Sequence, residues 1–229
     1  MSISHLEETV RSLHPTSLLE IGCGYGRHLT SSLTNFCDRV VATDIAPYES
    51  RWQEITPTSP IRFLRMDATA LGFPDNSFPL VLGRDTLHHI SRWPEVLSEM
   101  VRVSSHYMLL EEPVDDLRSA AKQRTHKAQE LFLQLQAEIG YSHYRHLGAD
   151  ELLSTIQEQA CLINFHMNRR DTSVTFDEFF HDFSVFAAKS QREDYWLGQL
   201  QDLRSRFDGA PLCKADRMTV LASKNHSSS

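Results

Sequence analysis

The chain has 229 residues, of which 30 are acidic and 23 basic, and its formal net charge is −7. With a pI near 5.9 and no long basic run, it lacks the Lys/Arg-rich face on which nucleic-acid binding usually depends, so we expect no nucleic-acid substrate. No apolar run approaches the roughly 18 residues of a membrane span. The first residues also lack the basic and apolar regions of a secretory signal, so we expect a cytoplasmic protein.

The four cysteines are widely spaced and form no C-x-x-C pair, which predicts free thiols in a reducing compartment.

Taken in chain order, apolar runs alternate with segments of helical periodicity. The predicted strands span residues 16–21, 39–44, 61–66, 79–83, 107–110, 162–167 and 218–222. The predicted helices span residues 5–13, 25–35, 46–57, 93–103, 115–137, 149–160, 176–188 and 191–207. Strands that alternate with helices predict an α/β fold whose parallel sheet is covered by helices on both faces.

We expect a single domain over residues 1–224, followed by a disordered tail at 225–229. Two helical insertions, at about 115–148 and 173–210, interrupt the regular pattern of the second half. They form either a lid over a substrate site or a dimer interface. An aromatic stripe within 176–186 is typical of core or interface, with the wall of an acceptor pocket as the alternative.

The first predicted strand runs into Glu20 and then into three glycines at alternate positions, Gly22, Gly24 and Gly26. Glycine tolerates positive φ and lets a ligand approach the backbone closely, and the helix that follows offers unpaired N–H groups. Arg27 stands where the dinucleotide fingerprint needs its third glycine, which disfavours a hydride-transferring enzyme.

Every one of the first five strands has an acid at or just past its end. These acids are Glu20, Asp44, Asp67, Asp85 and the pair Glu111-Glu112. A single strand-end acid is commonly a cap or a turn residue. Because ligands of open α/β sheets bind beyond the carboxyl ends of the strands, five aligned acids suit a ligand that carries an ammonium, a sulfonium and ribose hydroxyls.

These motifs together resemble those of class I S-adenosylmethionine-dependent methyltransferases, from about residue 16 to residue 113. The carriers are E-x-G-x-G-x-G followed by a strand and Asp44, the run M-D-A-T-A-L-G-F-P-D-N-S-F at 66–78, and L-H-H at 87–89. The last two are similar to the small-molecule, ubiquinone/menaquinone-biosynthesis type, the type 11 group. Pro79 and the order of L-G-F-P depart from that pattern, but neither departure falls on an expected cofactor contact.

The resemblance implies a Rossmann-like sheet of seven mainly parallel strands, in the order 3-2-1-4-5-7-6 with the last strand antiparallel. It also implies transfer of a methyl group from S-adenosyl-L-methionine to a small-molecule acceptor by in-line displacement. A non-catalytic or regulatory protein that keeps the cofactor, or an RNA or protein methyltransferase, is the alternative. The signatures N-P-P-[YF] and D-P-P-[YF] of some macromolecule methyltransferases do not follow the fourth strand.

The residues that the resemblance assigns to the cofactor are Glu20, Gly22, Cys23, Gly24, Tyr25, Gly26, Asp44, Ile45, Asp67, Ala68, Arg84 and Asp85. Asp44 would accept hydrogen bonds from both ribose hydroxyls, because an ionised carboxylate accepts two bonds at once. Ile45 would cover one face of the adenine, and Asp67 would accept from the adenine amino group.

His88, His89 and His143 are the candidate general bases, because the pKa of histidine lies near working pH. The alternative for the first two is that they order a loop or cap the next helix, and for His143 that it lies in a surface loop. Metal binding by His143 and His146 is disfavoured, since no third ligand lies nearby in the sequence.

Overall fold

A computed structural model describes residues 4–26, 29–55, 60–115 and 117–224. Its main sheet has the strand order β3-β2-β1-β4-β5-β10-β7, to which a short β6 adds on β5. Strand β10 runs antiparallel to both of its neighbours, and the other pairings of the sheet are parallel. The predicted fold class is therefore confirmed, with β7 and β10 as the sixth and seventh strands of the predicted order. The predicted tail at 225–229 lies outside the described residues.

The bounds of the elements are as follows. The strands are β1 (Ser17–Ile21), β2 (Arg39–Asp44), β3 (Ile61–Arg65), β4 (Phe78–Arg84), β5 (Ser104–Asp115), β6 (Leu147–Gly148), β7 (Ala160–Asn168), β8 (Ser173–Val174), β9 (Leu212–Cys213) and β10 (Asp216–Lys224). The helices are α1 (His5–Leu13), α2 (Leu29–Leu33), α3 (Glu49–Trp52), the 3₁₀ turn η2 (Leu87–His89), α4 (Trp93–Val103), α5 (Ala120–Glu138), α6 (Ala149–Gln159), α7 (Phe176–Phe179), α8 (Phe183–Ala187) and α9 (Glu193–Phe207).

Two apolar clusters sandwich the sheet. Helices α1 and α2 pack on one face through Leu6, Val10 and Leu33, all fully buried. Helices α4 and α6 pack on the other face through residues such as Met100 and Ile156. The central strand β1 is buried along its whole length, which is why its sequence is apolar rather than alternating.

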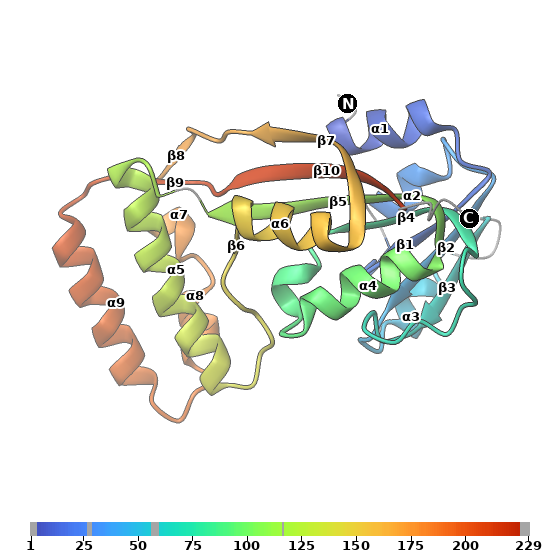
Figure 1. The fold of residues 1–229 in the computed structure, drawn as a ribbon. Helices are drawn as coiled ribbons and strands as arrows, with labels where there is room; N and C mark the ends of the chain where they lie inside the picture. Colours follow the sequence, from blue (N-terminus) through green and yellow to red (C-terminus); the bar gives the residue numbers. More distant parts are fainter. Residues whose placement is uncertain (1–3, 27–28, 56–59, 116, 225–229) are drawn as a thin grey trace.

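The two insertions form a third apolar cluster of their own. Helices α5, α7, α8 and α9 pack together, and Figure 1 shows them beyond the carboxyl end of β5. The predicted helix 176–188 is broken into α7 and α8, and the turn between them lets Phe180 and Phe183 both enter this cluster, with ring centroids 5.4 Å apart. The aromatic stripe therefore contributes to a core. The small sheet β8-β9, which the sequence did not predict, joins the segment before α7 to the segment after α9.

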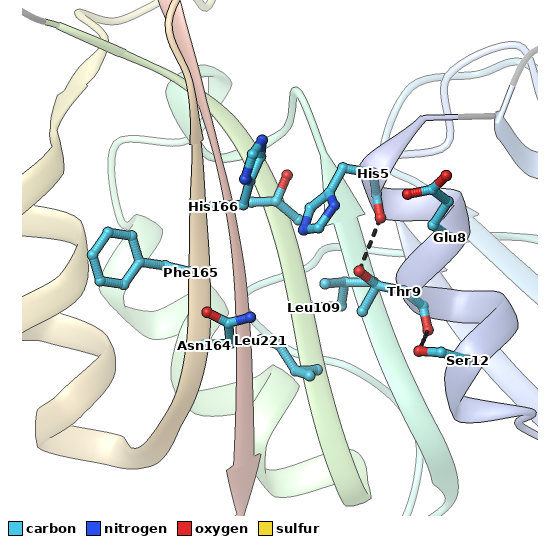
Figure 2. A pocket seen from close by; sticks show the side chains of 10 residues that line it. His5, Glu8, Thr9, Ser12, Leu109, Asn164, Phe165, His166 and Leu221 are labelled. Carbon is cyan, nitrogen blue, oxygen red and sulfur yellow. Dashed lines mark hydrogen bonds between the residues drawn. The ribbon is translucent and has the colours of Figure 1, made fainter. Parts of the chain in front are cut away.

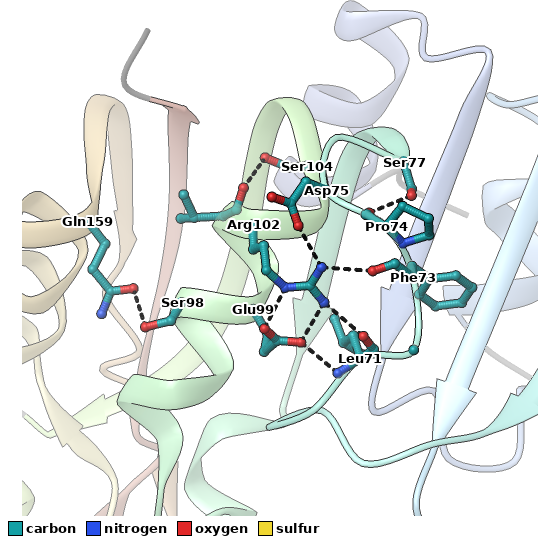
Figure 3. A network of polar contacts seen from close by, with 12 residues as sticks. Leu71, Phe73, Pro74, Asp75, Ser77, Ser98, Glu99, Arg102, Ser104 and Gln159 are labelled. Atoms are coloured by element: carbon teal, nitrogen blue, oxygen red, sulfur yellow. Dashed lines mark hydrogen bonds and ion pairs between the residues drawn. The ribbon is translucent and has the colours of Figure 1, made fainter. Parts of the chain in front are cut away.

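Helix α4 also anchors the loop that follows the third strand (Figure 3). The Arg102 guanidinium donates to the carbonyls of Leu71 and Phe73 and to the carboxylates of Asp75 and Glu99, at 2.7–2.9 Å. This clamp fixes the chain from the end of β3 to the start of β4. Pro79, at the start of β4, falls at a register shift against β5, as its missing N–H requires.

Within the part of the chain that the structure describes, no helix is long and apolar enough to cross a membrane.

Candidate active site

The glycine turn leaves β1 and opens a gap against bare backbone. Gly22, Gly24 and Gly26 all have positive φ, between 54° and 71°. A Cβ on Gly22 would lie 2.3 Å from Thr86 Oγ1, and one on Gly26 would lie 2.5 Å from the Phe63 ring, so packing requires glycine at both positions. A Cβ on Gly24 would meet nothing within 4 Å. Gly24 therefore faces open space, as the predicted cradle requires.

Asp44, at the carboxyl end of β2, holds this turn in place. One carboxylate oxygen accepts from the Gly24 N–H at 2.8 Å, and the other accepts from the Ala46 N–H at 2.9 Å. The Gly24 carbonyl in turn accepts from the Trp52 indole at 2.9 Å. Each oxygen of Asp44 keeps acceptor capacity for one further donor, such as a ribose hydroxyl.

Glu20 is buried beneath the turn, with 4% of its surface exposed. Its Oε2 has no hydrogen-bond partner among the described residues. Burial raises the pKa of Glu20 to about 7, although Thr30 and the Arg84 guanidinium oppose the shift. A buried, unpartnered carboxylate oxygen is costly, and a bound ammonium would satisfy it.

The adenine side of the predicted site lies next along the sheet edge. Asp44 O accepts from the Met66 N–H at 2.9 Å, which brings the third strand end beside the second. Ile45 is 60% exposed and offers an uncovered apolar surface there. Asp67 Oδ1 accepts from the Thr69 N–H and hydroxyl, and these bonds hold the pKa of Asp67 below its usual value despite partial burial. The partly buried Ala68 follows it.

The loop after β4 is strained at Asp85, which has φ +54° without being glycine. Asp85 pairs with the Arg217 guanidinium of β10 at 2.8 Å, and the same guanidinium reaches Glu111 at 3.1 Å. Arg84 lies 3.9 Å from the Asp85 carboxylate. The conformation of this loop is therefore fixed by charges from β5 and β10.

Two further residues of the turn have roles that limit their chemistry. The Tyr25 ring, 55% exposed, lies against Tyr48 with ring centroids 4.5 Å apart, at the rim of the gap. Burial raises the pKa of Cys23 far above its usual value, so its sulfur is a thiol and not a nucleophilic thiolate.

The 3₁₀ turn after β4 is organised by Glu112, a buried carboxylate of β5. Its Oε1 accepts from the Thr86 and Leu87 N–H groups at 2.7 and 2.9 Å, and its Oε2 accepts from His88 Nδ1 at 2.9 Å. Because a carboxylate only accepts, Nδ1 of His88 carries the proton and Nε2 is left with its lone pair. The pair has the form of a carboxylate-oriented base.

His89 and His143 are anchored in the same way. His89 Nδ1 donates to the Ser142 carbonyl and His143 Nδ1 donates to Gln136 Oε1, each at 2.9 Å. Burial lowers the pKa of His89, and it lowers that of His143 to about 3. Both imidazoles are therefore neutral at physiological pH, with Nε2 as an acceptor.

The structure brings the three predicted histidines together with a fourth, His146. The ring centroid of His88 lies 4.3 Å from that of His89, 5.2 Å from that of His143 and 5.7 Å from that of His146. The loop 139–147 crosses the 3₁₀ turn to do this, and its Tyr144 N–H donates to the His88 carbonyl at 2.7 Å. His143 is thus a half-buried member of the cluster, carried by a loop whose other residues are mostly exposed.

The sequence pointed to Glu112 only as one of several strand-end acids, and it left His146 without a role. The spacing of Glu112 from the L-H-H motif gives no local signal, because their contact depends on the pairing of β4 with β5. A cavity of about 250 Å³ lies beside His88, bounded by Leu87, Trp93 and Tyr144. No group of three or more side chains able to hold a metal ion occurs among the described residues.

Comparisons with known proteins agree with this geometry. Residues 19–106 match the family model described as a methyltransferase domain. No curated protein matches the chain.

Solved structures match nearly the whole chain at low identity. A methyltransferase candidate from Bacillus halodurans C-125 is 18% identical, with a TM-score of 0.68 over 98% of this chain and 100% of its own. The YcgJ protein of Bacillus subtilis is 18% identical, with a TM-score of 0.69 over 97% of this chain and 98% of its own. The N-methyltransferase NodS of Bradyrhizobium japonicum, in complex with S-adenosyl-L-homocysteine, is 13% identical, with a TM-score of 0.56 over 97% and 89%.

Proposed function

We propose that the chain is a class I S-adenosylmethionine-dependent methyltransferase of the type 11 group, and that it transfers a methyl group from S-adenosyl-L-methionine to a small-molecule acceptor. The match of residues 19–106 to a methyltransferase domain supports this proposal. The observation that carries the proposal is the open space at Gly24 beside the Asp44 carboxylate, with a buried and unpartnered oxygen of Glu20 at the end of the same strand. When bound, the cofactor supplies an electrophilic methyl group on a sulfonium.

The residues present fit that cofactor. Glu20 would pair with its ammonium, Asp44 would accept from the ribose hydroxyls, and Ile45 would cover the adenine. Gly24 leaves room against its backbone for the methionine part, Gly22 and Gly26 allow the turn to pack on Thr86 and Phe63, and Arg84 and Asp85 would border the same end. The charge of Glu20 is matched to a cation, since burial and the nearby Asp44 keep its pKa near 7 and an ammonium would lower it.

On the acceptor side, His88 is the residue that we assign as general base. Its Nδ1 lies 2.9 Å from the Glu112 carboxylate, whereas the carboxylate beside His146 Nδ1, that of Asp115, is 3.5 Å away, and His89 and His143 contact a carbonyl and an amide oxygen. The lone pair on Nε2 would accept the proton that an acceptor hydroxyl or amine loses as its heavy atom attacks the methyl carbon. His89 and His143 would hold the acceptor by hydrogen bonds, because their depressed pKa values disfavour the imidazolium.

A small acceptor and a cytoplasmic location are parts of the same proposal. The insertions stand at the carboxyl edge of the sheet, where the loop 139–147 packs onto the 3₁₀ turn. A covered site of this kind favours a small molecule over a macromolecule. The free thiols Cys23, Cys37, Cys161 and Cys213 suit a reducing compartment.

The test separates binding from turnover. Calorimetric titration with S-adenosyl-L-homocysteine measures cofactor binding, and a radiolabelled-methyl assay on a panel of small phenols, amines and thiols measures transfer. We expect His88→Gln to lose at least about a hundredfold in kcat with cofactor affinity unchanged. His106→Gln, an exposed histidine near the opposite end of β5, is the matched control.

Cofactor binding without turnover on any acceptor would favour the non-catalytic alternative, and no binding would refute the proposal. Equal kcat in wild type and His88→Gln would remove His88 as the base.

A further inference from the structure

Strand β7 forms one edge of the main sheet, and among the described residues it pairs only with β10. An edge strand presents unpaired N–H and C=O groups, and proteins usually protect such edges with charges, proline or short length. The opposite edge, β3, is five residues long, carries Arg62 and Arg65, and follows Pro60. β7 is nine residues long, and its sequence A-C-L-I-N-F-H-M-N contains no charged residue and no proline.

The edge strand also exposes apolar side chains. Ile163 is 50% exposed and Phe165 is 48% exposed. A bulge leaves Ile163 without a partner on β10, so the regular stretch of β7 is Asn164–Asn168. Figure 2 shows Phe165 on one side of this strand and Asn164 and His166 on the other, so one face of the edge exposes an aromatic ring.

We propose that β7 of one chain pairs antiparallel with β7 of a second copy, so that the two sheets join into one across a twofold axis. The regular stretch N-F-H-M-N is nearly symmetric about His166. With the axis there, Asn164 faces Asn168 of the second copy and Phe165 faces its Met167. An amide pair and a sulfur–aromatic pair would then repeat on both sides of the axis.

The charges that flank β7 fit antiparallel pairing better than parallel pairing. Arg169 and Arg170 follow the strand. With the axis at His166 they face Ile163 and Leu162 of the second copy, so the arginines of the two copies lie at opposite ends of the seam. A parallel arrangement would bring like charges together.

This interface is separate from the helical insertions, for which the sequence left a dimer interface as one of two interpretations. It also lies at an edge of the sheet and not at the carboxyl ends of the strands that build the cofactor site. The proposal is therefore independent of the methyltransferase function.

Sedimentation velocity over a wide concentration range tests the proposal on the full chain. We expect wild type to sediment as a species of twice the 26.3 kDa chain mass. Phe165→Lys and Ile163→Lys place a charge at the seam on both copies, and we expect each to raise the dimer dissociation constant by about a hundredfold. Both side chains are half exposed, so thermal unfolding should show the variants to be folded.

Val185→Lys is the matched control, since Val185 is 56% exposed on α8 in the helical cluster. Oxidative cross-linking of His166→Cys in a Cys161→Ser background checks the register, because only an axis near His166 brings the two sulfurs together. A monomer at every concentration would overturn the proposal. So would a dimer that survives both β7 substitutions, or one that only Val185→Lys dissociates.

Discussion

Replacing Asp44 by asparagine tests a residue that holds the glycine turn in place and that we propose to bind the ribose of the cofactor. The two carboxylate oxygens hold the N–H groups of Gly24 and Ala46. An asparagine has one acceptor oxygen, so its NH₂ group must face one of these two donors. The substitution therefore removes one bond that shapes the glycine turn, together with the negative charge that the ribose hydroxyls would meet.

The magnitude follows from hydrogen bonds to a charged group. Each such bond contributes about 1.5–3 kcal/mol, so weakening both ribose bonds costs about 3–4 kcal/mol, or roughly a 10²- to 10³-fold loss of affinity. The lost turn bond costs about 1–2 kcal/mol of folding stability, which for a chain of this size lowers the Tm by about 4 °C. Asp44→Ala leaves no acceptor, and we expect it to abolish measurable affinity.

Calorimetric titration with S-adenosyl-L-homocysteine and thermal unfolding of the same samples measure the two effects. Asp38→Asn, an exposed carboxylate before the other end of β2, is the matched control and should change neither. If the dissociation constant of Asp44→Asn stays within about threefold of wild type while the protein is folded, the placement of the ribose at Asp44 is wrong.

Three further predictions concern pH and stability. Because burial raises the pKa of Glu20 to about 7, its carboxyl is protonated below that pH and must lose the proton to pair with an ammonium. Cofactor affinity should therefore fall by up to about tenfold per pH unit below 7. A flat pH profile of the affinity in calorimetry would contradict this. Burial lowers the pKa of His143 to about 3, so its imidazole stays neutral in the folded state, while in the unfolded chain it takes up a proton below pH 6.5. The free energy of unfolding in urea should therefore decrease by about 1 kcal/mol from pH 6.5 to pH 5, a figure that allows for the partial exposure of His143. His143→Phe should remove that part of the pH dependence, and an unaltered slope would show that other groups cause it. Arg102→Met should lower the Tm by about 6–8 °C, since the guanidinium of Arg102 joins two carbonyls to Glu99 and Asp75. A shift below about 2 °C would mean that the loop between β3 and β4 does not depend on Arg102 for its stability.

The sequence predicts the strands of the first half of the fold closely, because each has an acid at or just past its end. The predicted bounds of β2 and α4 agree with the structure residue by residue. The second half is less predictable, since α7 and α8 have a continuous helical pattern that tertiary packing breaks. The segment 46–57 forms only α3 in the described part, where Tyr48 and Trp52 are drawn to the rim of the glycine turn.

The candidate site shows the same division. The candidate cofactor residues could be named from the sequence because they follow successive strand ends and match the motifs of the family that the chain resembles. Glu112 and His146 were missed as partners of His88, since one comes from a neighbouring strand and the other from a loop almost 60 residues away in the chain. No local pattern encodes contacts that exist only once the sheet and the insertion have docked.

Strand β5 is the longest strand described, and its last residues belong to both parts of the molecule. Glu112 orients His88, while Asp115 lies 2.8 Å from His126 of α5 and 3.5 Å from His146. The sheet and the helical cluster are thus mechanically joined through a few consecutive residues. A chimaera that took its helical cluster from another protein of this fold would have to inherit the end of β5 as well, or His88 would lose the carboxylate that orients it.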